Sequence, residues 1–143
     1  MGASLLAPLE TQVSAILDAA HVVHRRLGSG WEKSVYLQVL EIVLVDRGVA
    51  TAHCSLPIVR SGATRATRRE GLLCDRKTWV YVEGGFLSAP ELRPALLVTR
   101  IDHAVLLRLT TTGVEFRIVY RDGTVNASAH TTQLPDAELA TVD

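Results

Sequence analysis

The densest group of side chains that could do chemistry is a basic run near the middle of the chain. Arg60, Arg65, Arg68 and Arg69 lie within ten residues of one another, and guanidinium groups are common partners of nucleic-acid phosphates. In a strand, however, Arg65 and Arg69 point to one side and Arg68 to the other. The chain has fifteen basic and fifteen acidic residues, whereas nucleic-acid-binding domains usually have a basic excess. We therefore favour a solvated strand face over a phosphate-binding surface.

Histidine and cysteine give little evidence for a metal or nucleophilic site. His21 and His24 could share one helix face, but no acid or thiol lies at ligand spacing from them. Cys54 and Cys74 form no CxxC pair and are interpreted as buried, reduced thiols. The sequence contains no P-loop, no GxGxxG and no Ser-His-Asp order. We predict that the protein holds no metal and no cofactor.

The aromatic side chains allow two interpretations. Trp31, Trp79, Tyr81 and Phe86 could stack on nucleic-acid bases. Because aromatic residues make up only 5% of the chain, we predict that they pack in the core or at an interface instead.

The elements that must position these residues follow from hydrophobic spacing. Helical spacing predicts helices over residues 8–27 and 31–46. Strands are expected at 49–59, 64–74, 78–83, 104–109 and 114–120, with a hairpin turn at 75–77. Ser88 and Glu91 have capping-box spacing, but Pro94 implies a helix that is short or that begins at Pro94. The predicted order is ααβββαββ, an α+β domain over residues 1–120 with a small mixed sheet flanked by helices. A polar tail or arm follows over 121–143.

Length and charge limit the function further. The chain has 143 residues, 48% of them hydrophobic and 21% charged, which is typical of one folded domain. No apolar run is long enough for a membrane span, and the first residues do not resemble a signal peptide. We expect a cytoplasmic protein without a membrane partner, whose zero net charge favours self-association.

The stretch AAHVVHRRLGSGWEKSVYLQVLEIVLVDRGV, residues 19–49, resembles the GxxExxY family of small bacterial proteins. That family is similar to a branch of the PD-(D/E)xK nuclease superfamily. Gly28, Gly30 and Tyr36 match the family motif, and weaker similarity continues to residue 119. The resemblance implies a nuclease-like fold with a metal site built from carboxylates and a lysine.

The chain departs from that pattern at each position that carries the chemistry. Lys33 stands where the family has glutamate, and Gly71 stands where the nuclease site has aspartate. Tyr81 and Glu83 occupy the positions of the glutamate and lysine in the Glu-x-Lys pair. Carboxylates are needed to hold Mg²⁺ for phosphodiester hydrolysis, so we expect no catalytic residues and no metal site. Only a migrated acid, such as Glu70 or Asp75, could rebuild the site.

We therefore predict a catalytically inactive nuclease-like fold that is reused as a structural, self-assembling protein. The expected partner is the protein itself, in a homo-oligomer larger than a dimer. Residues 1–8 and 121–143 are expected to contribute contacts between copies, with 124–130 adding a strand to a neighbour's sheet. The alternative is a metal-dependent nuclease, or a nucleic-acid-binding protein, with a rearranged site and weak contact through the four arginines.

Overall fold

The strands form one mixed sheet, and helices cover both of its faces. The structure, a computed structural model, describes residues 11–59, 65–82 and 87–127. Within them lie helices α2 (Thr11–Leu27), α3 (Lys33–Asp46) and α4 (Ala89–Thr99). The strands are β1 (Thr51–Ile58), β2 (Thr67–Cys74), β3 (Thr78–Val82), β4 (His103–Leu109), β5 (Val114–Tyr120) and β6 (Val125–Ala127). They lie side by side in sequence order. The predicted α+β class with a mixed sheet is confirmed.

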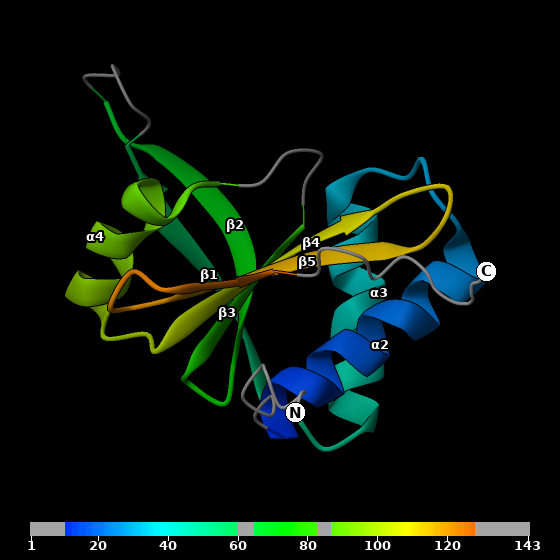
Figure 1. The fold of residues 1–143 in the computed structure, drawn as a ribbon. Helices are drawn as coiled ribbons and strands as arrows, with labels where there is room; N and C mark the ends of the chain where they lie inside the picture. Colours follow the sequence, from blue (N-terminus) through cyan, green and yellow to red (C-terminus); the bar gives the residue numbers. More distant parts are fainter. Residues whose placement is uncertain (1–10, 60–64, 83–86, 128–143) are drawn as a thin grey trace, which may run out of the picture.

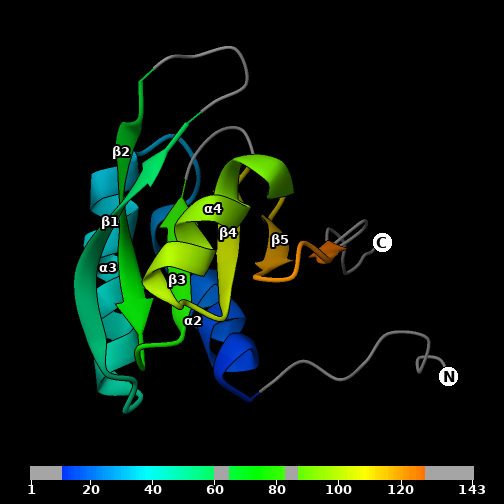
Figure 2. The ribbon, with the colours of Figure 1, turned by 90° about the vertical axis from the view of Figure 1, so that its left-hand side faces the viewer.

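The direction of the strands changes once, at the helix that crosses the sheet. β3 and β4 are parallel and are connected through α4, whereas the other neighbouring strands are antiparallel. Helices α2 and α3 cover one face and α4 covers the other (Figure 1). Figure 2 shows α4 in front of the sheet, with α2 and α3 behind it.

Each face of the sheet has its own hydrophobic core. Leu72, Val80 and Val105 pack with α2 and α3 on one face, while Trp79 and Leu106 pack with α4 on the other. All five residues of β3 are buried, as expected for a strand covered on both faces. Alternate side chains of β3 therefore lie in the core beneath α2 and α3 and in the core beneath α4.

The first two helices are amphipathic to different degrees. α2 buries Val13, Ile16, Ala20 and Val23, a regular helical stripe. It ends before Gly28, whose φ of 71° is the left-handed conformation that glycine readily adopts. α3 also has exposed apolar residues on its outer side, Ile42 and Val45.

Helix α4 corrects one expectation. Ser88 Oγ accepts a hydrogen bond from the Glu91 N–H at 3.3 Å, and Glu91 Oε1 accepts one from the Ser88 N–H at 2.8 Å. The helix begins at this capping box and continues through Pro94 to Thr99, so a start at Pro94 is wrong. Pro94 is the sixth residue of the helix, so it removes the one helical hydrogen bond that an N–H there would donate to the Pro90 carbonyl, and the packing of Leu92 and Leu96 outweighs this loss.

The end of the described chain also differs from the predicted order. Val125–Ala127 pair with β5 of the same chain as a short edge strand, within the stretch expected to be a tail and to pair with a neighbour. The strand follows a turn in which Asp122 Oδ1 accepts hydrogen bonds from the backbone N–H and hydroxyl of Thr124, at 2.9 and 2.7 Å. Three residues are too few to show strand periodicity in a sequence. Residues 1–10 and 128–143 lie outside the described residues.

Among the described residues, the structure contains no helix with the length and apolar character needed to cross a membrane.

Candidate functional site

The turn between α2 and α3 is held by the residues that match the family motif. The Tyr36 hydroxyl donates a hydrogen bond to the Gly28 carbonyl at 2.7 Å and accepts one from the Trp31 N–H at 3.2 Å. The Trp31 indole N–H donates to the Leu27 carbonyl at 2.7 Å. Gly30 has a φ of 95°, a left-handed conformation suited to glycine. This network fixes where α3 begins, and thereby where Lys33 lies.

Two of the substituted positions contact each other. Lys33 Nζ donates a hydrogen bond to the Tyr81 hydroxyl at 3.2 Å, and the same nitrogen lies 5.1 Å from the centre of the Tyr81 ring. Tyr81 is buried in the middle of β3, whereas Lys33 is exposed at the start of α3. The residues at the two expected glutamate positions have thus become a cation and a phenol that interact directly.

At the third substituted position, Gly71, residues of the neighbouring strand β3 occupy the space that a side chain would need. A Cβ atom at Gly71 would lie 2.5 Å from the Val80 carbonyl oxygen and 2.6 Å from Trp79 Nε1. Trp79 is fully buried, and its indole N–H donates to the Cys54 carbonyl on β1 at 2.9 Å. The indole therefore lies across β2 in the space that a side chain at Gly71 would need.

Trp79 also supports Tyr81 on the same face of β3. The two rings are stacked, with centroids 5.0 Å apart and an interplanar angle of 9°. The prediction that aromatic residues pack in the core is confirmed for these two. Trp31 is 52% exposed, and Phe86 lies outside the described residues.

These residues do not fit a divalent metal ion. Mg²⁺ takes oxygen ligands, of which carboxylates are the usual protein donors, and Lys33, Gly71 and Tyr81 supply none. Nowhere in the described part of the chain do three His, Cys, Asp or Glu side chains gather at metal-binding distance. Glu83 lies outside the described residues. Asp75 is engaged in the β2–β3 turn, where it accepts hydrogen bonds from the Ala50 N–H at 3.0 Å and from Gln12 Nε2 at 2.6 Å.

An open pocket of about 400 Å³ lies beside Lys33. None of the described residues that line it is a carboxylate or an imidazole, so it offers cations and apolar surface but no general base. The lining residues are Gly30, Trp31, Lys33, Tyr36, Val82, Arg108 and Leu109.

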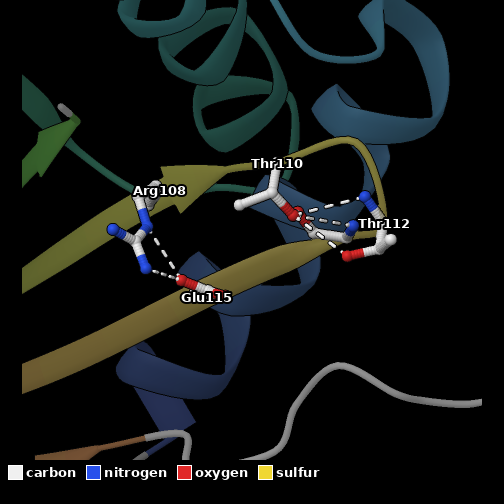
Figure 3. A network of polar contacts seen from close by, with 5 residues as sticks. Arg108, Thr110, Thr112 and Glu115 are labelled. Atoms are coloured by element: carbon white, nitrogen blue, oxygen red, sulfur yellow. Dashed lines mark hydrogen bonds and ion pairs between the residues drawn. The ribbon is translucent and has the colours of Figure 1, made fainter. Parts of the chain in front are cut away.

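Sequence reasoning missed the ion pair at this pocket. Arg108 on β4 pairs with Glu115 on β5, with Arg108 Nε 2.8 Å from Glu115 Oε1 (Figure 3). The two residues face each other across the antiparallel strands. Opposite charges at equal distances from the Thr-Thr-Thr-Gly turn were the signal that could have revealed the pair.

The turn itself is tied to helix α2. Thr110 Oγ1 accepts hydrogen bonds from the Thr112 N–H at 3.3 Å and the Gly113 N–H at 3.2 Å (Figure 3). His24 Nε2 lies 2.6 Å from the Thr110 carbonyl oxygen. His24 therefore has a structural contact, and burial lowers the pKa of His21 nearby.

The structure does not gather the predicted arginines into one surface. Arg68 donates to Ser55 Oγ at 2.8 Å and to the Ser55 carbonyl at 3.0 Å. Arg69 points to the opposite face of β2, and its buried Nε has no hydrogen-bond partner among the described residues. Arg65 is exposed before β2, and Arg60 lies outside the described residues.

The two cysteines are free. Burial raises the pKa of Cys74 to about 12, helped by the nearby charges of Asp75 and Glu41. Burial also raises the pKa of Cys54, which is only partly buried. Both thiols are therefore protonated at neutral pH, which argues against a nucleophilic role.

Comparison with known proteins identifies the superfamily to which this chain belongs. Residues 10–83 match the family model of the PD-(D/E)XK nuclease superfamily. Because that match covers more than half of the chain, the protein belongs to this superfamily. Searches of curated proteins and of solved structures find no match.

Proposed function

We propose that this protein is a nuclease-superfamily fold that lacks metal-dependent hydrolysis and acts in the cytoplasm as a self-assembling structural subunit. The observation that carries the first part is the Trp79 indole in the space beside Gly71. We also propose that it belongs to the GxxExxY branch, which the hydrogen bonds of Tyr36 to Gly28 and Trp31 support.

The chain lacks several of the groups that metal-dependent hydrolysis needs. Hydrolysis of a phosphodiester at such a site requires a metal to activate water and to stabilise developing negative charge. The chain has replaced the aspartate by Gly71 and two glutamates by Lys33 and Tyr81. A single substitution could tune a metal site, but these replacements leave it without its ligands.

The test is a cleavage assay on single- and double-stranded DNA and RNA with Mg²⁺ and with Mn²⁺. We expect no turnover above that of a Glu70→Ala plus Glu83→Ala variant, which removes the carboxylates that lie next to Gly71 and Val82 in the sequence. Turnover in the natural chain that disappears in this variant would show that a migrated acid rebuilds the site.

Self-assembly is supported by the charge of the chain and by its terminal segments. The net charge is zero, so long-range repulsion does not oppose contact between copies. Residues 1–8 and 121–143 lie outside the part that matches the superfamily model, and the described part of the second segment adds β6 to the edge of the sheet. We propose a homo-oligomer larger than a dimer, with these segments contributing contacts.

Two truncations distinguish the contribution of residues 128–143 to assembly from that of the edge strand β6. Removing residues 128–143 keeps β6, whereas removing 121–143 deletes it. We expect light scattering to show a smaller mass for both truncations, with circular dichroism unchanged for the shorter deletion. A full-length protein that is monomeric at micromolar concentration would contradict self-assembly.

A further inference from the structure

The pocket beside Lys33 has the size and the lining of a site for a small molecule. Its volume of about 400 Å³ falls in the range of roughly 300–1,000 Å³ that is typical of such sites. Val82 and Leu109 supply apolar surface, and Lys33 and Arg108 supply the charged groups. None of the described lining residues is acidic. A pocket with apolar walls and charges of one sign is suited to a ligand of the opposite charge.

The ammonium group of Lys33 is held in place without being neutralised. Lys33 Nζ lies 3.2 Å from the Tyr81 hydroxyl and 5.1 Å from the centre of the Tyr81 ring, and none of the described carboxylates forms an ion pair with it. Tyr81 is buried and stacked on Trp79, so it is a rigid support for the lysine. A cation–π contact orients a cation and leaves its charge available to an anion.

Trp31 presents an aromatic ring at the same pocket. The ring is 52% exposed, although its indole N–H is held by the Leu27 carbonyl at 2.7 Å. This N–H is the only polar group of a tryptophan side chain, so the fixed ring offers apolar surface rather than a hydrogen bond. A planar, apolar group is the kind of partner that packs on such a ring.

The second cation of the pocket shows how much negative charge the ligand should carry. Arg108 is paired with Glu115 across β4 and β5 (Figure 3), so its positive charge is already offset. Lys33 then leaves one net positive charge among these groups. A ligand with a single negative charge matches this balance, whereas a phosphate monoester with two negative charges exceeds it.

We propose that this pocket binds a small monocarboxylate with an aromatic body. The carboxylate pairs with the Lys33 ammonium, and the aromatic body packs on the Trp31 ring. The described lining residues include no general base, so the ligand is bound and released unchanged. This inference goes beyond the proposed function and does not depend on self-assembly.

The first experiment compares four probes by calorimetric titration of the full-length protein. Naphthoate carries the charge and the aromatic body together, naphthamide lacks the charge, and acetate lacks the body. Naphthyl phosphate carries a second negative charge. We expect naphthoate to bind with a dissociation constant at least about tenfold lower than that of each other probe.

Two lysine variants locate the charge that binds naphthoate. Lys33→Met keeps an unbranched side chain and removes the ammonium, and it should raise the dissociation constant at least about tenfold. Lys77→Met is the matched control, because Lys77 is the only other lysine in the chain. It precedes β3, whereas the pocket residue Val82 ends that strand. This variant should bind as the natural chain does, and circular dichroism checks that both variants fold.

Two variants of Trp31 separate packing on the ring from support of the turn. Both Trp31→Phe and Trp31→Ala lose the hydrogen bond to the Leu27 carbonyl. Only the phenylalanine keeps an aromatic surface, so Trp31→Phe should retain most of the affinity for naphthoate and Trp31→Ala should lose it. Equal losses would assign Trp31 a structural role alone and contradict its contact with the ligand.

Three further results would overturn the inference. One is naphthoate that fails to bind at millimolar concentration, or binds no more tightly than naphthamide. Another is tighter binding of naphthyl phosphate, which would show that the pocket recognises phosphate. The third is loss of binding in Glu83→Gln together with normal binding in Lys33→Met, which would assign the site to an acid instead of the lysine. None of these results bears on the cleavage assay or on the assembly measurements.

Discussion

At the scale of single residues, Gly71 and Trp79 depend on each other. The absence of a side chain at Gly71 lets the indole cross β2 and reach the Cys54 carbonyl. The same indole would obstruct an aspartate introduced at position 71. Restoring that one acid would therefore disturb the core rather than rebuild a metal site.

We expect Gly71→Ala to lower the free energy of unfolding by about 1–3 kcal/mol, because the new methyl group would overlap backbone and ring atoms. Urea denaturation measures the change. Gly113→Ala is the matched control, since nothing lies within 4 Å of a Cβ there. The loss should shrink in a Trp79→Leu background, and an equal loss there would mean that the ring is not the obstacle.

Cys74 provides a second prediction at this scale. Its folded pKa of about 12 is above the ordinary value of 9.0, so the folded state keeps the proton that the unfolded state releases. The contribution of Cys74 to stability should be present below pH 9.0 and lost as the pH rises toward 12.

Thiol labelling checks this directly. At pH 8 we expect Cys74 to react only after the chain unfolds, whereas Cys54, which is partly buried, reacts sooner. A Cys74→Ser variant should show a shallower decline of stability between pH 9.0 and 11. Rapid labelling of Cys74 in the native protein would contradict its burial.

At the scale of elements, local patterns predicted most of the fold. The spacing of apolar residues predicted α2 and α3, and alternation together with turn signals predicted β1 to β5. The capping box indicated one of the two possible starts of α4, and the structure has that one. β6 was missed because three residues carry too little pattern. The contacts of Trp79 with Gly71 and of Lys33 with Tyr81 were missed for another reason. They join residues on different elements, and no local spacing encodes them.

The β2–β3 hairpin gives a prediction for an element. Asp75 and Arg76 both have positive φ, 51° and 62°, as the two central residues of a type I′ turn do, and the Lys77 N–H donates to the Cys74 carbonyl across this turn at 3.1 Å. The Asp75 carboxylate compensates by accepting hydrogen bonds from Ala50 and Gln12, but the Arg76 side chain forms no hydrogen bond with the described residues that would offset its strain.

We therefore expect Arg76→Gly to raise the free energy of unfolding by about 0.5–1 kcal/mol, because relief of strain exceeds the added flexibility of the unfolded chain. Thermal unfolding measures the gain. Lys77→Gly, one residue later and without a positive φ, should destabilise instead. A loss of stability in Arg76→Gly would show that the turn does not hold Arg76 under strain.

At the scale of the whole molecule, the sheet separates two hydrophobic cores. The chain as a whole has equal numbers of basic and acidic residues. The substituted positions Lys33, Gly71 and Tyr81 lie at the start of α3, on β2 and on β3. Of the arginines considered for weak nucleic-acid contact, Arg68 and Arg69 lie on β2 and point to opposite faces, and Arg65 lies just before this strand. The fold keeps the superfamily's layers, the net charge is zero, and the described arginines among the four, Arg65, Arg68 and Arg69, form no continuous track for a phosphate backbone.

Nucleic-acid binding should accordingly be weak and strongly dependent on salt. Each phosphate neutralised by a lysine or arginine contributes about −0.9 to the slope of log affinity against log salt on duplex DNA. With two to four contacts at most, from Arg60, Arg65, Arg68 and Arg69, we expect a slope of about −2 to −4. Fluorescence titration of a labelled duplex at two salt concentrations measures this slope.

Two variants test whether the arginines carry the binding. Arg65→Ala should reduce the slope by about 1 if that residue contacts phosphate. Arg76→Ala, in the turn at the far end of β2, should leave the slope unchanged. Sub-nanomolar binding that does not respond to salt would mean that the protein recognises nucleic acid through a surface other than these arginines.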